Sequence, residues 1–164
     1  MKFAVGSSGV TRALVLAWRA AGIVTGEPSN VRAQEVDRLL VVSGSCSPAT
    51  AAQIARSTAD GFTSIRADVD ALLRGESTEE ERLVHTAGDA LSEGGRAVIH
   101  SAEGPLGAVA PAAGDRLGSA LGRVASAAIR QAGLRRVLFA GGDTSSHGRC
   151  HANRRRAVRP RRPC

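Results

Sequence analysis

The chain has 164 residues, 43% of them hydrophobic and 23% charged, and its formal net charge is +7. This length and composition exclude a disordered chain and two domains of ordinary size, and no apolar run approaches the roughly 20 residues that span a bilayer. The excess charge is local: seven of the 22 basic residues lie in 148–164, and the 15 that remain balance the 15 acidic residues.

Short apolar runs alternate with longer segments of helical periodicity, which is typical of βαβ units around a parallel sheet. In chain order, the first part predicts a strand at 2–5, a helix at 10–21, a linker at 23–36, a strand at 39–42, a helix at 48–58 and a strand at 62–66. The second part predicts a short helix at 68–73, a helix from Ser77 to Gly94, a strand at 97–100, a loop at 101–114, a long helix ending at Gly133 and a strand at 137–140. We therefore predict a three-layer α/β fold, with a mainly parallel sheet of about five strands and helices on both faces.

Two helices carry clear start signals in the sequence. Ser47 is a good N-cap and Pro48 a good first helical residue, so a helix is expected to begin there. Ser77 and Glu80 have the spacing of a capping box, in which each side chain bonds to the backbone of the other residue.

The regular pattern stops after His147. Residues 148–164 contain seven arginines and no acid, and they lack apolar periodicity. The strand that ends at residue 140 should lead into a helix that packs back on the sheet, and this segment does not fit that helix. We therefore interpret 1–147 as one domain, incomplete at its C-terminal end, and 148–164 as an Arg-rich tail that is disordered or encoded out of frame.

The three cysteines, Cys46, Cys150 and Cys164, have neither a metal-binding spacing nor the pattern of a disulfide framework. The N-terminus does not resemble a signal peptide. We therefore expect a cytoplasmic protein without a membrane partner.

Three strand-to-helix junctions are built from glycine and small hydroxyl residues, at 6–9, 44–47 and 141–145. In a parallel sheet such junctions share one edge, at the carboxyl ends of the strands, where open α/β folds bind ligands. Glycine lets the backbone approach a ligand, and helix N-termini present free N–H groups, so a phosphate fits this edge. The sequence lacks a Walker A motif, a G-x-G-x-x-G fingerprint and a G-x-S-x-G hydrolase elbow, which leaves the kind of phosphate site open at this point.

Two segments carry a family resemblance. VSGSCSPATAAQI at 42–54 and AGGDTS at 140–145 look like the signatures of the four-carbon acid sugar kinases. The opening GSSGV at 6–10 is similar to the start of that family's C-terminal, nucleotide-binding domain. The resemblance covers about residues 3–147.

The resemblance implies an ATP-dependent kinase that phosphorylates four-carbon sugar acids such as erythronate, threonate or a 3-oxo-tetronate. Matched position by position, Ser45 would contact ATP, and Gly141, Gly142, Asp143 and Thr144 would form the loop around the phosphates. ATP and Mg²⁺ are the implied ligands, and Asp143 could hold the metal ion directly or through water. The family's larger N-terminal domain, which binds the sugar acid and should supply the catalytic base, has no counterpart here, and a later Gly-rich segment of Lys-Gly-Gly type is also missing. No catalytic residue is therefore assigned, and the chain alone is expected to be inactive.

Several of these residues also have an interpretation that is purely structural. The glycines at 141–142 also suit a tight turn, Asp143 or Thr144 also suits a helix cap, and Cys46 also fits an inert thiol. His100 ends a strand at the ligand edge, so a functional role for it stays open. Two further readings of the whole chain also remain: a non-functional remnant, and a nucleic-acid-associated module that acts through the basic tail, although we regard nucleic acid as an unlikely partner.

Overall fold

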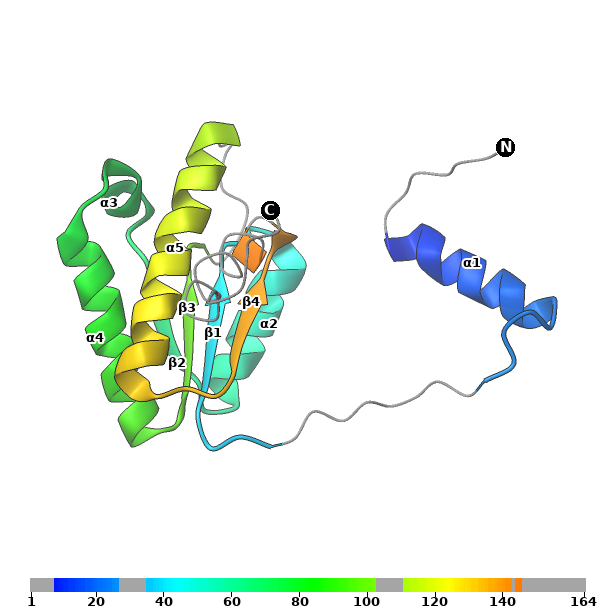
Figure 1. Ribbon diagram of the computed structural model, residues 1–164, viewed down its shortest axis with the longest axis horizontal. Helices are drawn as coiled ribbons and strands as arrows, with labels where there is room; N and C mark the ends of the chain where they lie inside the picture. Colours follow the sequence, from blue (N-terminus) through cyan, green and yellow to red (C-terminus); the bar gives the residue numbers. More distant parts are fainter. Residues whose placement is uncertain (1–7, 27–34, 103–110, 143, 146–164) are drawn as a thin grey trace, which may run out of the picture. The chain divides into compact units, whose positions relative to one another are not determined.

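The computed structural model describes residues 8–26, 35–102, 111–142 and 144–145 (Figure 1). The strand predicted at 2–5, the Arg-rich tail and Asp143 lie outside these residues. The chain divides into two compact units, Met1–Glu35 and Val36–Cys164. In the first unit, helix α1 (Ser8–Ala20) confirms the helix predicted at 10–21, and Gly22 follows it with a φ of +71°.

The second unit is built on a four-stranded parallel sheet. Its strands are β1 (Leu39–Ser43), β2 (Thr63–Arg66), β3 (Arg96–His100) and β4 (Val137–Ala140). They lie in the order β2-β3-β1-β4, and each neighbouring pair is parallel. The four strands that the sequence predicted within the described residues are thereby confirmed. Their order across the sheet could not be predicted from the sequence and is known from the structure.

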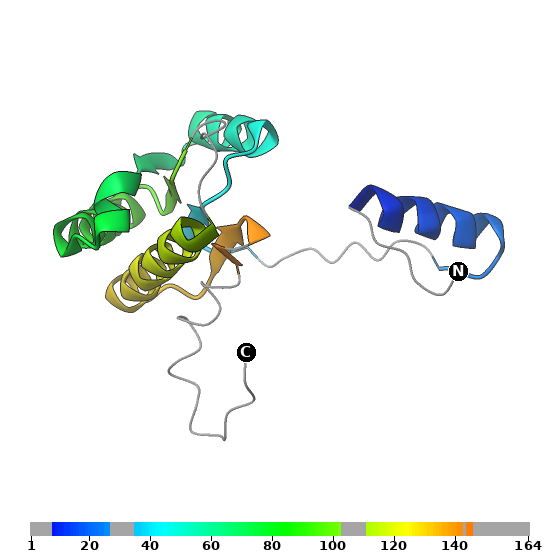
Figure 2. The same ribbon diagram turned by 90° about the horizontal axis from the view of Figure 1, so that it is seen from above.

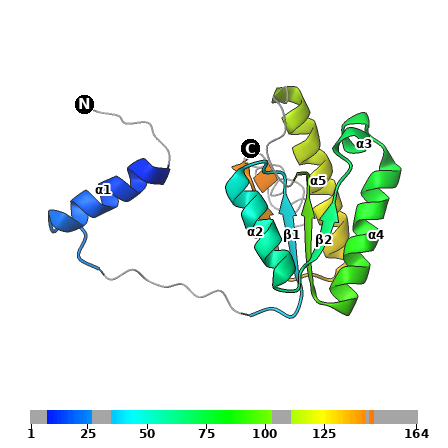
Figure 3. The same ribbon diagram turned by 180° about the vertical axis from the view of Figure 1, so that it is seen from behind.

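Helices cover both faces of this sheet, which confirms the three-layer α/β prediction. Helix α2 (Pro48–Ala59) lies on one face, and α4 (Ser77–Glu93) and α5 (Pro111–Ala132) lie on the other (Figures 1 and 3). Seen from above, the strands run between α2 and α5 (Figure 2). The short helix α3 (Val69–Arg74) packs against α4 and α5.

The main core lies between the sheet and the pair α4 and α5. Alternate strand residues point into it, because successive side chains of a strand face opposite sides of a sheet. Fully or almost fully buried members include Leu40 and Val42 of β1, Ile99 of β3, Leu83 of α4 and Leu121 of α5. Leu121 also reaches the carboxyl end of β1, because its side chain would lie 3.4 Å from a Cβ atom placed at Gly44.

Local signals explain two of the helix starts. The Ser47 hydroxyl accepts a hydrogen bond from the Thr50 N–H (3.1 Å) and caps α2, as predicted. The Asp68 carboxylate accepts one from the Ala71 N–H (3.0 Å) and caps α3.

Two predicted boundaries are wrong. Glu76, not Ser77, is the N-cap of α4, and it makes no side-chain capping bond; Glu80 instead forms an ion pair with Arg123 of α5 (2.5 Å). A tertiary contact has therefore replaced the expected capping box. Helix α5 begins at Pro111, so the loop predicted at 101–114 is shorter than expected.

Candidate functional site

The carboxyl ends of β1 and β4 lie next to each other. Ser43 pairs with Ala140 at the end of the two strands, and the Gly44 N–H donates a hydrogen bond to the Ala140 carbonyl (3.3 Å). The glycine–hydroxyl turns that follow these strands therefore start side by side. This confirms the expectation that the junctions at 44–47 and 141–145 share one edge of the sheet, whereas the junction at 6–9 belongs to the other unit and is only partly described.

The two turns approach each other closely at Gly44 and Gly141. A Cβ atom at Gly44 would overlap the Thr144 Oγ1 atom. A Cβ atom at Gly141 would lie 3.4 Å from the Ser45 backbone nitrogen and 3.3 Å from Thr144 Oγ1. The φ of Gly141 is +110°, a conformation that other residues rarely adopt. Ser45, Gly141 and Thr144, which the sequence singled out from distant segments, thus form one cluster.

Hydroxyl groups line the β1 side of this cluster. The buried Ser43 hydroxyl accepts a hydrogen bond from the Ser45 N–H (3.4 Å). The Ser45 hydroxyl shares a hydrogen bond with Thr50 Oγ1 (3.0 Å) and accepts one from the Ser47 N–H (3.4 Å). Because Ser47 is the N-cap of α2, the Ser45 side chain lies at the positive end of that helix dipole. This is a favourable place for an anion.

On the β4 side the backbone turns directly into helical conformation, at residues 142, 144 and 145. The Ser145 N–H and hydroxyl both donate to the Gly141 carbonyl, at 2.9 and 2.5 Å. Thr144 is buried, and Gly142 is exposed at the start of this turn. Asp143 was predicted as a site residue and lies outside the described residues.

Two residues at the end of β3 extend this edge. The Ser101 N–H donates to the Ser43 carbonyl (3.0 Å), which ties the end of β3 to that of β1. His100 is fully buried, and its Nε2 atom shares a hydrogen bond with the Ser64 hydroxyl of β2 (2.9 Å). Ser43 and Ser101 were not predicted as site residues, although their place at or directly after a strand end was the available signal. We call Ser43, Gly44, Ser45, Ser101, Gly141 and Thr144 the hydroxyl edge.

A second polar region surrounds α3 and consists of charged groups. The buried carboxylate of Glu79 accepts hydrogen bonds from the Asp68 N–H (2.8 Å) and from the Arg82 guanidinium (2.7 and 2.8 Å). Arg82 also donates to the Arg66 carbonyl (2.9 Å). The hydrogen bonds from Arg82 lower the pKa of Glu79 against the opposing effect of burial. We call Asp68, Glu79, Arg82 and Arg116 the α3 clamp.

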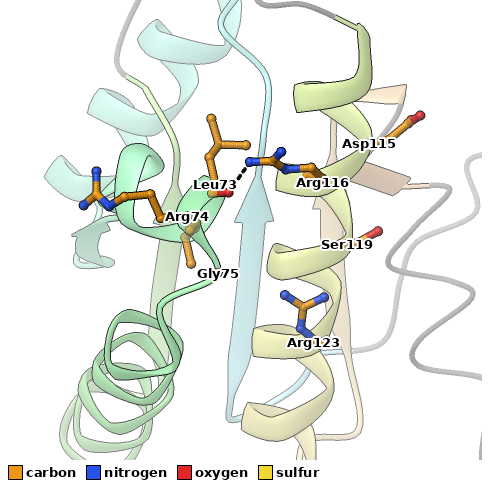
Figure 4. A pocket seen from close by; sticks show the side chains of 8 residues that line it. Leu73, Arg74, Gly75, Asp115, Arg116, Ser119 and Arg123 are labelled. Atoms are coloured by element: carbon orange, nitrogen blue, oxygen red, sulfur yellow. Dashed lines mark hydrogen bonds between the residues drawn. The ribbon is translucent and has the colours of Figure 1, made fainter.

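Arg116 joins this clamp from α5. A groove of about 500 Å³ lies between α3 and α5, and its lining includes Arg74, Arg116 and Arg123 (Figure 4). Arg116 points across the groove and donates to the Leu73 carbonyl near the end of α3. Arg74 pairs with Glu76 and Arg123 with Glu80, so each of the three arginines already has a partner. Arg116 therefore links the end of α3 to α5, and the lining of the groove includes no member of the hydroxyl edge.

The described residues also bear on two other kinds of site, a metal site and a membrane-spanning helix. Among them, no three histidine, cysteine or acidic side chains lie close enough together to hold a metal ion. None of the described helices combines the length and the apolar character needed to cross a bilayer.

A parallel α/β sheet whose adjacent strands end in converging glycine–hydroxyl turns defines the class: a nucleotide-binding α/β domain. The family model described as "Nucleotide-binding C-terminal domain" matches residues 40–157, and the chain belongs to this family, that of the four-carbon acid sugar kinases. A 3-oxo-isoapionate kinase from Paraburkholderia graminis is 40% identical over 159 residues, which cover 87% of this chain and 34% of the relative. The chain thus spans about a third of the length of that kinase.

Proposed function

We propose that this chain is the nucleotide-binding domain of an ATP-dependent kinase that phosphorylates four-carbon sugar acids of the erythronate, threonate or 3-oxo-tetronate type. The observation that carries the proposal is the convergence of Ser45 with Gly141 and Thr144 at the ends of adjacent strands. The similarity to a 3-oxo-isoapionate kinase supports the choice of a sugar acid as the phosphoryl acceptor.

In this proposal the hydroxyl edge binds the phosphates of ATP. Ser45 contributes its hydroxyl at the start of α2, and Gly141, Gly142, Asp143 and Thr144 form the loop around the phosphates. Phosphoryl transfer depends mainly on positioning and on neutralising the charge of the transferred group, so a cluster of N–H and hydroxyl donors is suitable. Mg²⁺ would arrive with the nucleotide and neutralise phosphate charge, with Asp143 as the candidate protein ligand.

The sugar acid and the catalytic base require a different part of an enzyme. The matched kinase is about three times as long as the region it shares with this chain, so we assign both functions to sequence of that kind. We therefore expect the 164-residue chain alone, acting in the cytoplasm, to bind ATP without phosphorylating a sugar acid.

Calorimetric titration of the full chain with MgATP tests the proposal. Ser45→Ala should weaken binding roughly tenfold, because it removes a hydroxyl donor to a charged ligand. Gly141→Ala should weaken it further, because its backbone conformation excludes a side chain. Ser92→Ala is the control, since this exposed hydroxyl lies on α4, outside the hydroxyl edge, and donates to the Gly88 carbonyl. The absence of binding by the unmodified chain, or equal losses in all three variants, would refute the proposal.

A further inference from the structure

The connections of the sheet place a switch point between β1 and β3. After β1 the chain continues into α2 on one face, and after β3 it continues into α5 on the opposite face (Figures 1 and 3). Where neighbouring parallel strands send their connections to opposite faces, a crevice opens outside their carboxyl ends, and ligands of open α/β folds bind there. Ser101 is the residue that directly follows β3 at this point.

Ser101 stands beside Gly44 on the core side of the sheet. The last paired residues of the two strands are Ser43 and His100, so Gly44 and Ser101 occupy the next position on each strand. Ser101 lies two residues beyond Ile99, which faces α4 and α5, and Gly44 lies two beyond Val42, which faces the same way. Thr144, in the turn that follows β4, lies so close to Gly44 that a Cβ atom there would overlap its Oγ1 atom. Ser101, Gly44 and Thr144 therefore follow one another just beyond the carboxyl ends of β3, β1 and β4.

The Ser101 hydroxyl is buried, and the described part of the chain offers it no partner. The residue is 2% exposed, and its Oγ atom has no hydrogen-bond partner among the described residues. A buried hydroxyl without a hydrogen bond lowers the stability of a folded protein, so a native structure that keeps one needs a reason. A ligand that accepts a hydrogen bond at this position would supply the missing partner.

We propose that Ser101, which follows β3, also binds the nucleotide, and that its hydroxyl donates a hydrogen bond to a phosphoryl oxygen. The inference rests on the proposed function and adds to it a residue that neither the family signature nor the sequence analysis assigned. It extends the phosphate site from the β1–β4 pair to the switch point between β1 and β3.

Ser126 provides a matched control for this proposal. Its hydroxyl is also buried, at 7% exposure, and also has no hydrogen-bond partner among the described residues. It lies on α5, five residues past the Leu121 side chain that approaches Gly44, and therefore about 7 Å further along the helix away from the hydroxyl edge. Ser126→Ala therefore removes the same kind of buried hydroxyl as Ser101→Ala, but at a distance from the proposed phosphate site.

The experiment compares Ser101→Ala and Ser126→Ala in the full chain, by calorimetric titration with MgATP and by thermal melting without ligand. We expect Ser101→Ala to raise the Kd roughly tenfold, and its ligand-free Tm to stay unchanged or rise, because an unpaired buried hydroxyl has been removed. Ser126→Ala should keep the unmodified Kd. Ser101→Cys, which preserves volume but donates weakly, should also raise the Kd.

The outcomes separate this inference from the proposed function. If Ser101→Ala and Ser101→Cys bind MgATP as tightly as the unmodified chain while Ser45→Ala binds less tightly, the inference fails and the proposed function stands. If Ser101→Ala lowers the ligand-free Tm and Ser101→Cys restores both Tm and Kd, the hydroxyl is structural and the inference fails. If the unmodified chain binds no nucleotide, both fail together.

Discussion

The hydroxyl edge and the α3 clamp are both polar, and both lie where the chain leaves a strand. Their polar groups differ, however, in the hydrogen-bond and ion-pair partners that they have. In the α3 clamp, the Glu79 carboxylate is held by Arg82 and by the Asp68 N–H. In the hydroxyl edge the described groups are neutral, and the buried Ser101 hydroxyl has no partner within the described structure. Charged groups that neutralise each other are suited to holding a helix in place, whereas a neutral donor that has no partner among the described residues, as at Ser101, is suited to receiving an anion.

This comparison argues against choosing a binding site by the number of arginines. The groove between α3 and α5 carries three of them, but each is engaged by a carboxylate or a carbonyl. The described members of the hydroxyl edge carry no charge, and in our proposal they would bind the phosphates through N–H groups, hydroxyls and the α2 dipole. The predictions that follow test this division, from the largest expected effect to the smallest.

Gly44→Ala should disrupt the hydroxyl edge most strongly. The new Cβ atom would displace the buried Thr144, at a cost of up to about 3 kcal/mol in the free energy of unfolding, and MgATP binding should be lost. Urea unfolding and titration measure the two effects. Gly114→Ala in α5 is the control: its Cβ atom would meet open space, so stability should hold or increase. A Gly44→Ala protein that binds MgATP normally would contradict the close approach of the two turns.

Glu79→Ala should destabilise the α3 clamp without weakening MgATP binding. It leaves the Asp68 N–H and the Arg82 guanidinium without their acceptor, and we expect a loss of about 2 kcal/mol in the free energy of unfolding. Glu81→Ala, which removes an exposed acid from the same helix turn, should change stability little. Weaker MgATP binding at a temperature where the Glu79→Ala protein is fully folded would show that the two regions are not independent.

The α3 clamp should also make stability depend on acid pH. The pKa of Glu79 is lower in the folded protein than its ordinary value of 4.5, chiefly because Arg82 donates hydrogen bonds to its carboxylate. Its contribution is therefore complete above pH 4.5 and is lost as the pH falls through the folded pKa. Urea unfolding from pH 7 to pH 3 should show a smaller acid-induced loss for Glu79→Ala than for the unmodified chain. An equal loss of stability between pH 7 and pH 3 in the two proteins would contradict the lowered pKa of Glu79.

Glu80→Ala should have the smallest effect. Its ion pair with Arg123 links α4 to α5, but both side chains are partly exposed, so the expected loss is below about 1 kcal/mol. Thermal melting at low and high salt should show a difference that shrinks as salt screens the pair. A loss as large as that of Glu79→Ala would contradict the weak contribution expected of a partly exposed ion pair.

Much of the fold could be predicted because the signals are local. Ser47 and Pro48 begin α2, as expected, because capping needs only neighbouring residues. The convergence of Ser45 with Gly141 could be predicted as well, since parallel strands send their carboxyl ends to one edge. The roles of Ser45, Gly141, Gly142, Asp143 and Thr144 as ATP ligands stay predictions.

The features that could not be predicted from the sequence depend on contacts between residues that are distant in the chain. Glu80 was expected to complete a capping box with Ser77, but Arg123 of α5 lies close enough to pair with it. Glu79 has no local signal of burial in the sequence, and its burial follows only from the packing of α3 against α4. Ser101 looked like a loop residue, because the strand order that brings it beside Ser43 has no local signal.

The central claim is that the nucleotide phosphates bind at the hydroxyl edge and not at the arginine groove. Titration of the isotope-labelled full chain with MgATP, followed through the backbone amide signals in NMR spectra, tests it most directly. We predict that the amides of Gly44, Ser45 and Gly141 shift together, while those of Arg74 and Arg116 stay in place. Shifts centred on Arg74 and Arg116, with the glycine amides unmoved, would contradict the account.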